Sequence, residues 1–286
     1  MTWLILFVFG IAIGSFLNVV AGRYDGEHFL LNNKVIGGRS HCEHCKKTLR
    51  WFELVPLVSF IMLGGRCARC KVKLSFQYPA VELISGLVFA LVPYRIETFF
   101  GMSGALLFGV AAFWVVAFEA LLVMSLIDIR LGIIPDELNV FLVVLGIFFG
   151  IFVTGYLGLA NHSLIDFYSA LFGLQENFWF NRIAAAVFAA AFFGFLILVT
   201  RGRGMGMGDL KLAIPLGLLF GWPDVLLVIA FANVVGAIVG LIAISFGKKS
   251  MKSTLPFGPF LAVGAALTFF FAYQSFQWYF SILGLH

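Results

Sequence analysis

About eight stretches of almost uninterrupted apolar residues dominate the sequence, and they restrict the chain to one broad class of fold. They cover approximately residues 2–21, 79–94, 104–127, 135–156, 183–200, 209–222, 224–246 and 256–283. A helix needs about 20 apolar residues to cross the hydrocarbon core of a bilayer. Most of the runs reach that length, whereas 79–94 and 209–222 are short. With 62% hydrophobic and 12% charged residues, the chain is expected to be an all-α polytopic membrane protein with about eight transmembrane helices.

Basic residues are distributed unequally among the segments that join these runs. If successive runs alternate in direction, one side of the membrane receives only Arg95 and Arg182. The other side receives ten basic residues in the loop at 22–77, together with Arg130, Arg201, Arg203, Lys211, Lys248, Lys249 and Lys252. Because lysine and arginine favour the cytoplasmic side, the loop is predicted to be cytoplasmic and both termini to lie outside. The net charge of +5 then reflects topology and loops near anionic lipid, and no nucleic-acid partner is expected.

The loop at 22–77 is the only sizeable polar segment, and it holds every cysteine of the chain. The cysteines form two Cys-x2-Cys pairs, which are Cys42 with Cys45 and Cys67 with Cys70. Two such pairs separated by 21 residues are typical of a structural four-thiolate zinc site. A loop with few core residues needs a metal of this kind to fold. The alternative is a pair of disulfides, which a reducing cytoplasm disfavours; His41 and His44 are expected to be solvated neighbours.

Three aspartates are expected at one membrane face, each at the end of an apolar run. Asp128 ends the third run, Asp136 opens the fourth, and Asp209 opens the sixth. A carboxylate in a membrane helix is costly unless it has a function. Two neighbouring carboxyl groups can hydrolyse a peptide bond, since an ionised one accepts a proton from water while a protonated one polarises the carbonyl. Spacing alone does not choose between Asp128 and Asp136 as the partner of Asp209.

Each of these acids also has a structural interpretation. Asp209 is suited to be a helix N-cap, and Asp136 is suited to the positive end of a helix dipole. Asp128 could reach water or pair with Arg130. Gly206 and Gly208 precede Asp209 without side chains, so a substrate backbone could approach closely there.

Three further polar residues lie in or beside the runs. Glu119 precedes Asp128 by nine residues, so at about 100° per residue it faces the opposite side of the helix and is expected to make a packing contact. Glu82 is expected at the cytoplasmic mouth of the second run and is the better candidate for the active region. Lys211, two residues after Asp209, is a supporting candidate in the same region.

Taken in order, these motifs resemble those of the bacterial type IV prepilin peptidases, which are GxGD intramembrane aspartyl proteases. A GxGD match alone is a weak signal, whereas the ordered set with two cysteine pairs in the first loop is a strong one. The residues that carry the resemblance are Gly14-Ser15-Phe16-Leu17-Asn18-Val19 with Arg23, the two cysteine pairs, Leu49-Arg50-Trp51 through Val55-Pro56 to Gly65-Arg66-Cys67, Tyr78-Pro79-Ala80-Val81-Glu82-Leu83, Asp128 through Pro135-Asp136, Gly206-Met207-Gly208-Asp209-Leu210-Lys211 and Pro256-Phe257-Gly258-Pro259. The loop departs modestly from the family pattern at Arg50, Glu53 and Gly64-Gly65.

The resemblance implies that Asp128 and Asp209 are the catalytic pair of an aspartic endopeptidase in a bacterial inner membrane. It implies that the substrates are prepilins of type IV pili and the pseudopilins of type II secretion, whose basic leaders are cut at the cytoplasmic membrane face. Asp136 and Glu137, beside the pair, would suit a basic leader. Members with a cysteine loop commonly also methylate the new N-terminal residue with S-adenosylmethionine, which implies a second, methyltransferase activity. No glycine-rich nucleotide fingerprint occurs in a strand–helix setting, so the sequence does not place the methyl donor.

The expected domains are a first transmembrane helix at 1–21, a four-cysteine loop domain at 22–77 and a peptidase core at 78–286. One competing class is an ion-coupled transporter, which would need internal repeats and acids near the middle of the membrane. Another is a zinc-ribbon scaffold without catalysis. A metalloprotease is disfavoured, because the chain has no His-Glu-x-x-His motif. The sequence leaves open which pilin is cut, the oligomeric state and the role of Glu119.

Overall fold

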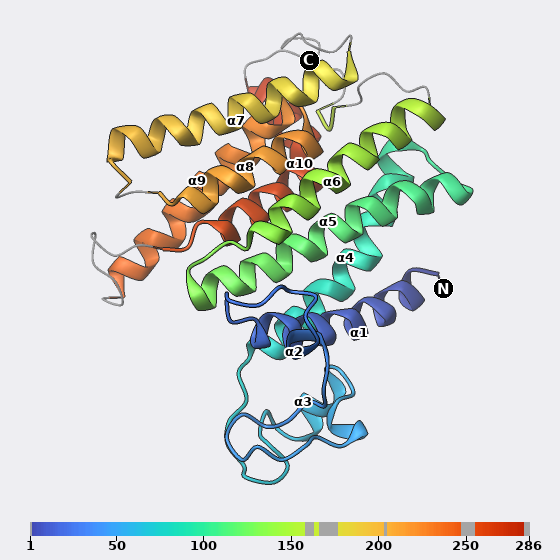
Figure 1. Cartoon of the computed structure of the whole chain (residues 1–286). Coiled ribbons are helices and arrows are strands. Elements are labelled where there is room, and N and C mark those ends of the chain that lie inside the picture. Colours follow the sequence, from blue (N-terminus) through green and yellow to red (C-terminus); the bar gives the residue numbers. More distant parts are fainter. Residues whose placement is uncertain (1, 158–162, 166–176, 203–204, 247–254, 283–286) are drawn as a thin grey trace. The chain divides into compact units, whose positions relative to one another are not determined.

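The computed structural model of the chain describes residues 2–157, 163–165, 177–202, 205–246 and 255–282 (Figure 1). Within these ranges the regular elements are helices, and strand-like pairing is limited to two isolated β-bridges. The chain forms two compact units, Met1–Ile127 and Asp128–His286, with the boundary inside one long helix. The expected all-α class is confirmed, while the functional division of the chain stays a prediction.

Seven helices of the described residues are long and apolar enough to cross a membrane, so the chain is a multi-pass membrane protein. They are α1 (Thr2–Arg23), α4 (Gln77–Phe100), α5 (Gly104–Leu131), α6 (Asp136–Phe152) continued by η2 (Val153–Leu157), α7 (Phe178–Thr200), α9 (Asp224–Ser245) and α10 (Gly258–Ile282). The run expected to be short over 79–94 is a helix of 24 residues that continues past Pro93.

The remaining expected span, the sixth run at 209–222, is the helix α8 (Met207–Phe220), which has 14 residues and is not among the seven. At about 1.5 Å per residue it advances only about 21 Å, which is less than the roughly 30 Å of the hydrocarbon core. It also begins two residues before the expected start at Asp209. α8 therefore needs partners for the backbone groups at its ends that water would otherwise satisfy.

The first unit is built on close packing between α1 and α4. A β-carbon on Gly10 would lie 2.8 Å from the carbonyl oxygen of Ser85, so the two helices can approach this closely only with glycine there. The Ser85 hydroxyl oxygen lies 2.7 Å from the Gly10 carbonyl oxygen and 2.9 Å from Oε1 of Glu119. Glu119 thus makes the polar packing contact that was expected of it.

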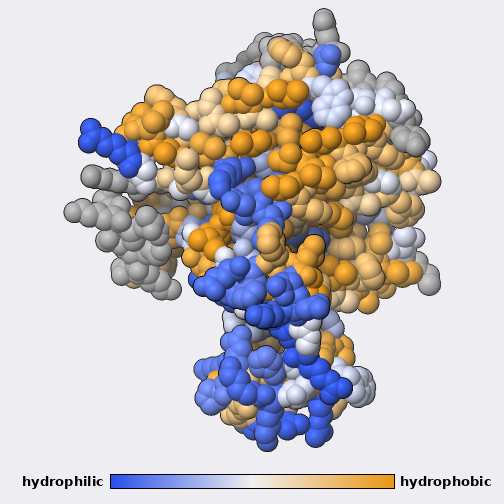
Figure 2. Space-filling view, viewed as in Figure 1, coloured by the Kyte–Doolittle hydropathy of each residue, from blue (hydrophilic) through white to orange (hydrophobic). Residues whose placement is uncertain are grey.

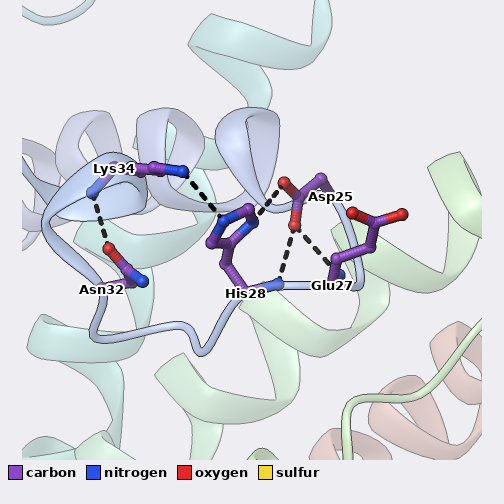
Figure 3. A network of polar contacts seen from close by, with 5 residues as sticks. All are labelled: Asp25, Glu27, His28, Asn32 and Lys34. Carbon is purple, nitrogen blue, oxygen red and sulfur yellow. Dashed lines mark hydrogen bonds and ion pairs between the residues drawn. The ribbon is translucent and has the colours of Figure 1, made fainter.

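The loop between α1 and α4 starts with a compact network of polar contacts (Figure 3). The Asp25 carboxylate accepts hydrogen bonds from the backbone N–H groups of His28 and Glu27, both at 3.0 Å, which lowers the pKa of Asp25 to about 2. Nδ1 of His28 lies 2.8 Å from Asp25, and Nε2 of the same ring lies 3.1 Å from Nζ of Lys34. Asn32 caps the helix that follows, so this part of the loop is held by local contacts.

The loop contains three short helical turns, α2 (Asn33–Ile36), η1 (Trp51–Glu53) and α3 (Val58–Met62). In Figure 2, hydrophilic side chains gather over this loop, whereas hydrophobic side chains cover much of the surface of the long helices. This contrast agrees with a polar loop carried by membrane-spanning helices.

The second unit surrounds α8 with longer helices. α8 packs against α6 and α7, and the three run side by side in Figure 1. A β-carbon on Gly217 would lie 2.5 Å from Cα of Ala186, so α7 and α8 are in backbone contact at this point. α9 packs against α10 in the same unit.

The end of α8 is fixed by polar side chains from the start of α7. Arg182 donates hydrogen bonds to the carbonyl groups of Leu218 and Leu219, which the helix itself leaves without partners. Asn181 donates to the carbonyl of Trp222 at 2.7 Å and accepts from the N–H of Trp222 at 2.9 Å. The backbone groups at this end are satisfied by protein, as an end far from water requires.

Asp224, at the start of α9, completes this cluster. Its side chain is 1% exposed, and it accepts hydrogen bonds from the hydroxyl of Ser163 at 2.6 Å and from the N–H of Leu164 at 2.8 Å. The Arg182 guanidinium and the Asp224 carboxylate also attract each other electrostatically. Arg182 and Asp224 are both buried and make most of their hydrogen bonds within the protein, so they are expected to fix one packing arrangement rather than to carry chemistry.

Candidate active site and metal centre

Asp209 lies in the first turn of α8, where it is 7% exposed. The N-cap position is taken by Gly206, and Asp209 is the third residue of the helix. Its Oδ2 atom accepts a hydrogen bond of 3.1 Å from the N–H of Gly206. The alternative that Asp209 is itself the N-cap is therefore wrong, because the helix starts earlier than the sequence suggested.

Asp128 lies in the last turn of α5 and is 5% exposed, so its carboxylate does not reach into water. Its Oδ2 atom accepts a hydrogen bond of 3.0 Å from the N–H of Gly258 at the start of α10. A β-carbon on Gly258 would lie 2.7 Å from that oxygen. Only glycine leaves room for the carboxyl group at this point.

Ile134, in the segment between α5 and α6, links the surroundings of the two aspartates. A β-carbon on Gly208, the residue before Asp209, would lie 3.2 Å from Cβ of Ile134. A β-carbon on Gly258, which binds Asp128, would lie 3.4 Å from Cδ1 of the same residue. The two buried acids therefore lie in one region of the second unit, around Ile134.

Asp136 and Lys211 form a separate contact at the start of α6 and α8. The ammonium group of Lys211 lies 2.8 and 2.9 Å from the two carboxylate oxygens of Asp136. The side chain of Asp136 is 67% exposed and that of Lys211 is 50% exposed, unlike those of Asp128 and Asp209. The structure thus distinguishes Asp128, which is buried like Asp209, from Asp136, which is exposed.

Glu82, near the start of α4, is in contact with the cysteine-bearing loop, and its place in the active region stays a prediction. It is 7% exposed in the first unit, and its Oε2 atom accepts a hydrogen bond of 2.7 Å from the N–H of Leu57. Leu57 has a φ of +58°, a conformation that is strained for a leucine. Glu82 therefore fixes a strained turn of the cysteine-bearing loop onto α4.

Two residues near the aspartates were not singled out by the sequence reasoning. Gly258 belongs to the motif Pro256-Phe257-Gly258-Pro259, but the sequence does not predict its hydrogen bond to Asp128, because the donor is a backbone N–H that no side-chain pattern marks. Asn139 is 6% exposed in α6, and neither atom of its amide has a hydrogen-bond partner among the described residues. A single asparagine within an apolar run, three residues after Asp136, was the available signal.

The four cysteines form one cluster in the first unit. The sulfur atoms of Cys42, Cys45, Cys67 and Cys70 all lie within 4.8 Å of one another, and none is in a disulfide. This donor set fits a tetrahedral metal ion such as zinc. His41 and His44 are exposed and outside the cluster, as expected.

The two cysteine pairs sit in turns of the same design. In the first, the N–H of Lys46 bonds to the carbonyl of Cys42, and Lys46 has a positive φ of 56°. In the second, Lys71 bonds to Cys67 in the same way with a φ of 57°. Such a repeated turn presents two sulfurs to a common point, which favours one shared ion.

Hydrogen bonds to sulfur favour the thiolate form at one position of the cluster. Backbone N–H groups of Cys70 and Arg69 lower the pKa of the Cys67 thiol to about 6. The Val72 N–H also lowers the pKa of Cys70, but burial and the neighbouring thiols outweigh it and raise the value to about 11. Since four sulfurs this close cannot all ionise alone, a cation is needed to hold them together as thiolates.

The comparisons with known proteins agree with this architecture. The model of the bacterial peptidase A24 N-terminal domain matches residues 8–96, and that of the type IV leader peptidase family matches residues 115–241. A prepilin leader peptidase/N-methyltransferase of Burkholderia pseudomallei (strain 1026b) is 35% identical over 92% of this chain and 84% of its own length. A relative with the same name from Bacillus subtilis is 30% identical over 93% of this chain and 93% of its own length. Another from Pseudomonas aeruginosa is 30% identical over 96% of this chain and 92% of its own length. No solved structure matches.

A multi-pass helical protein that buries two aspartates in one region has the architecture of an intramembrane aspartic peptidase. The matches make the assignment more specific, because they cover most of the chain at 30% identity or more. The chain belongs to the type IV leader peptidase family. The family resemblance found in the sequence is confirmed, as is the enzyme class that it implied, a prepilin peptidase with N-methyltransferase activity.

Proposed function

We propose that Asp128 and Asp209 together catalyse hydrolysis of the peptide bond that joins a prepilin leader to the mature pilin. One observation carries this proposal, which is that two buried carboxyl groups lie in one region around Ile134, each bound by a backbone N–H. Two such groups share one proton more readily than they both ionise. One acid is then ready to accept a proton and the other to donate one.

The hydrogen bonds of each carboxyl group suggest how it is oriented. In both residues a backbone N–H binds Oδ2, from Gly206 for Asp209 and from Gly258 for Asp128. The Oδ1 atoms are then the ones available for water and substrate. Two carboxyl groups fixed in this way can bind a water molecule and a substrate carbonyl at the same time.

The reaction needs no covalent intermediate with the protein. The ionised carboxylate takes a proton from water, and the water oxygen forms a bond to the scissile carbonyl carbon. The protonated carboxyl group hydrogen bonds to the carbonyl oxygen as negative charge develops on it. When the C–N bond breaks, the proton taken from water passes to the leaving amine, so the pair is ready for another cycle.

A basic leader would suit the acidic groups near the pair. Asp136 is exposed beside α8, and Oε2 of Glu137, the next residue, is buried without a hydrogen-bond partner among the described residues. Oppositely charged leader residues would be attracted to this side of the unit. We place this side in the cytoplasm because of the distribution of basic residues; Arg203, Lys248, Lys249 and Lys252, which contribute to that argument, lie outside the described residues.

The cluster of four cysteines is proposed to hold a structural zinc ion. Four sulfur ligands leave no coordination position for a substrate, so the ion would fold the loop rather than take part in a reaction. The purified protein should contain about one equivalent of zinc, and Cys42→Ser should lose it. A metal-free protein whose loop resists proteolysis as well as the metal-bound one would contradict this role.

S-adenosylmethionine is the proposed methyl donor, by analogy with relatives whose names include N-methyltransferase. When bound, it supplies an activated methyl group to the new N-terminal amine. Two buried oxygen atoms at the seam of α1 and α4 fit a sulfonium cation, namely the Glu82 carboxylate and Oδ1 of Asn18, which has no hydrogen-bond partner among the described residues. These groups lie near each other, since Asn18 donates to the Tyr78 carbonyl one turn before Glu82 on α4.

Both activities can be tested in one experiment with purified protein. A prepilin is incubated with the protein in the presence and in the absence of S-adenosylmethionine, and the new N-terminus is analysed by mass. Cleavage is expected in both samples, and a mass increase of one methyl group only with the donor. An intact leader in both samples would overturn the proposed function.

A further inference from the structure

The buried side-chain amide of Asn139 has no hydrogen bond that would offset its loss of contact with water. Its side chain is 6% exposed, and neither Oδ1 nor Nδ2 has a hydrogen-bond partner among the described residues. An amide buried in this way destabilises the folded protein, because it gives up water on both atoms and receives nothing in return. Asn181 in the same unit is also buried and uses both of its amide atoms.

Asn139 lies on the stripe of α6 that faces α8. Leu142, one turn later, has no exposed surface. Gly146, one further turn along, faces α8 directly, because a β-carbon on it would lie 3.4 Å from Cβ of Leu218. Residues spaced by three and four positions share a helix face, so Asn139 is directed toward the seam between α6 and α8.

Two contacts fix the level of Asn139 along that seam. Before it, Asp136 of α6 binds Lys211 of α8, and after it, Gly146 of α6 meets Leu218 of α8. Both helices run in the same direction past each other, so Asn139 lies at about the level of Leu212, one turn beyond Asp209. The unpartnered amide is therefore about 5 Å further along the bundle than the proposed catalytic pair.

The backbone of an unwound substrate needs hydrogen-bond partners, and the Asn139 amide can supply them. A protease acts on an extended segment, so a pilin helix must unwind near the bond that is cut. Its unpaired backbone N–H and C=O groups are costly away from water. An asparagine side chain supplies one acceptor and a pair of donors, which match a backbone N–H and C=O as a neighbouring strand would.

We infer that Asn139 binds the backbone of the unwound substrate segment on the pilin side of the cleaved bond. This inference rests on the proposed function of Asp128 and Asp209. It also explains why the amide has no partner within the described protein, because the partner arrives with the substrate. Asn139 is thus a substrate-positioning residue for leader cleavage, and the resemblance to the family did not assign it.

The substitution Asn139→Leu tests whether the Asn139 amide binds substrate or is a buried polar group without a function. Leucine has nearly the same volume without polar atoms, so the variant should be as thermally stable as the wild type or more stable. If Asn139 binds substrate, kcat/KM for a full-length prepilin falls about tenfold to a hundredfold. The matched control is Asn233→Leu in α9. Asn233 is exposed, and its amide bonds only to its own helix, so this variant should cleave at the wild-type rate.

Wild-type kcat/KM in the Asn139→Leu variant would overturn the inference. If that variant does not fold, Asn139→Ser and Asn139→Ala provide the comparison, since they differ by one hydroxyl group. The serine variant is expected to be the more active one, and equal activities would also reject substrate binding. Asp128→Asn measured alongside separates the two claims, because cleavage by that variant would reject the proposed catalytic pair itself.

Discussion

The buried polar groups at the two ends of α8 differ in how many of their hydrogen bonds are made, although Nε of Arg182 at its end also has no partner among the described residues. At its end, Asn181 uses both amide atoms on Trp222, and both oxygens of Asp224 accept hydrogen bonds. At its start, Asp209 has one backbone hydrogen bond, and the amide of Asn139 in the neighbouring helix has none among the described residues. Both regions are buried in the same unit, so burial by itself does not separate them.

The difference teaches how to tell a structural polar cluster from a reactive one. Groups whose hydrogen bonds are made within the protein hold the helices in place, and they have little capacity left for a ligand. Groups that stay partly unsatisfied lower the stability, and they are kept where a substrate or water will bind. Substitutions at the end of α8 should therefore change stability, whereas those at its start should change activity.

The largest effect is expected at the proposed catalytic pair, Asp128 and Asp209. Asp128→Asn and Asp209→Asn each replace a carboxyl group by an amide of nearly the same size, which cannot accept or donate the proton that the reaction needs. Leader cleavage should fall about 10²- to 10⁴-fold or more, while the thermal midpoint in detergent stays near the wild-type value. If these variants lost stability to the same degree as activity, the start of α8 would have a structural role like that of its end.

Arg182→Met should produce the converse result. It leaves the carbonyl groups at the end of α8 without donors and removes the positive charge that attracts Asp224. The expected loss of stability is about 1–3 kcal/mol for each buried carbonyl group left without a donor, measured by thermal or denaturant unfolding. Adding Asp224→Asn removes the uncompensated charge and should restore part of it. If instead the folded fraction cleaved prepilin much more slowly than wild type, the end of α8 would have a role in catalysis.

The smallest effect is expected from the exposed ion pair at the start of α8. Lys211→Met removes the partner of Asp136, but both side chains are at least half exposed. The change in stability should be below about 1 kcal/mol. Cleavage should be measured at low and high salt, because any effect on binding of a basic leader is expected to weaken as salt increases. A tenfold slower reaction at both salt concentrations would place this pair in the reactive region.

The parts of this molecule that could be predicted from sequence follow from residue type and spacing. Seven of the eight apolar runs form helices that can span a membrane, while the run at 209–222 forms the short α8. The two Cys-x2-Cys pairs predicted a cluster that the structure forms from all four sulfurs. Family resemblance chose Asp128 as the partner of Asp209, which spacing had left open. Helix ends were less accurate, because Asp209 is the third residue of its helix rather than the first.

What could not be predicted depends on contacts between residues distant in the chain. The donor to Asp128 is a backbone N–H of Gly258, and no side-chain pattern marks it. The role of Arg182 was also missed, since a lone arginine between apolar runs was read only as a topology signal. Asn139 became significant only when its amide proved to be without partners among the described residues of the folded unit.

The bond from Gly258 to Asp128 has a consequence for biosynthesis. Its two residues are 130 positions apart, and the donor belongs to the last helix of the described chain. A ribosome makes Asp128 and Asp209 well before that donor, so a nascent chain contains both acids but cannot yet orient the first of them. If Asp128 is catalytic as proposed, peptidase activity should therefore appear only after α10 has entered the bilayer.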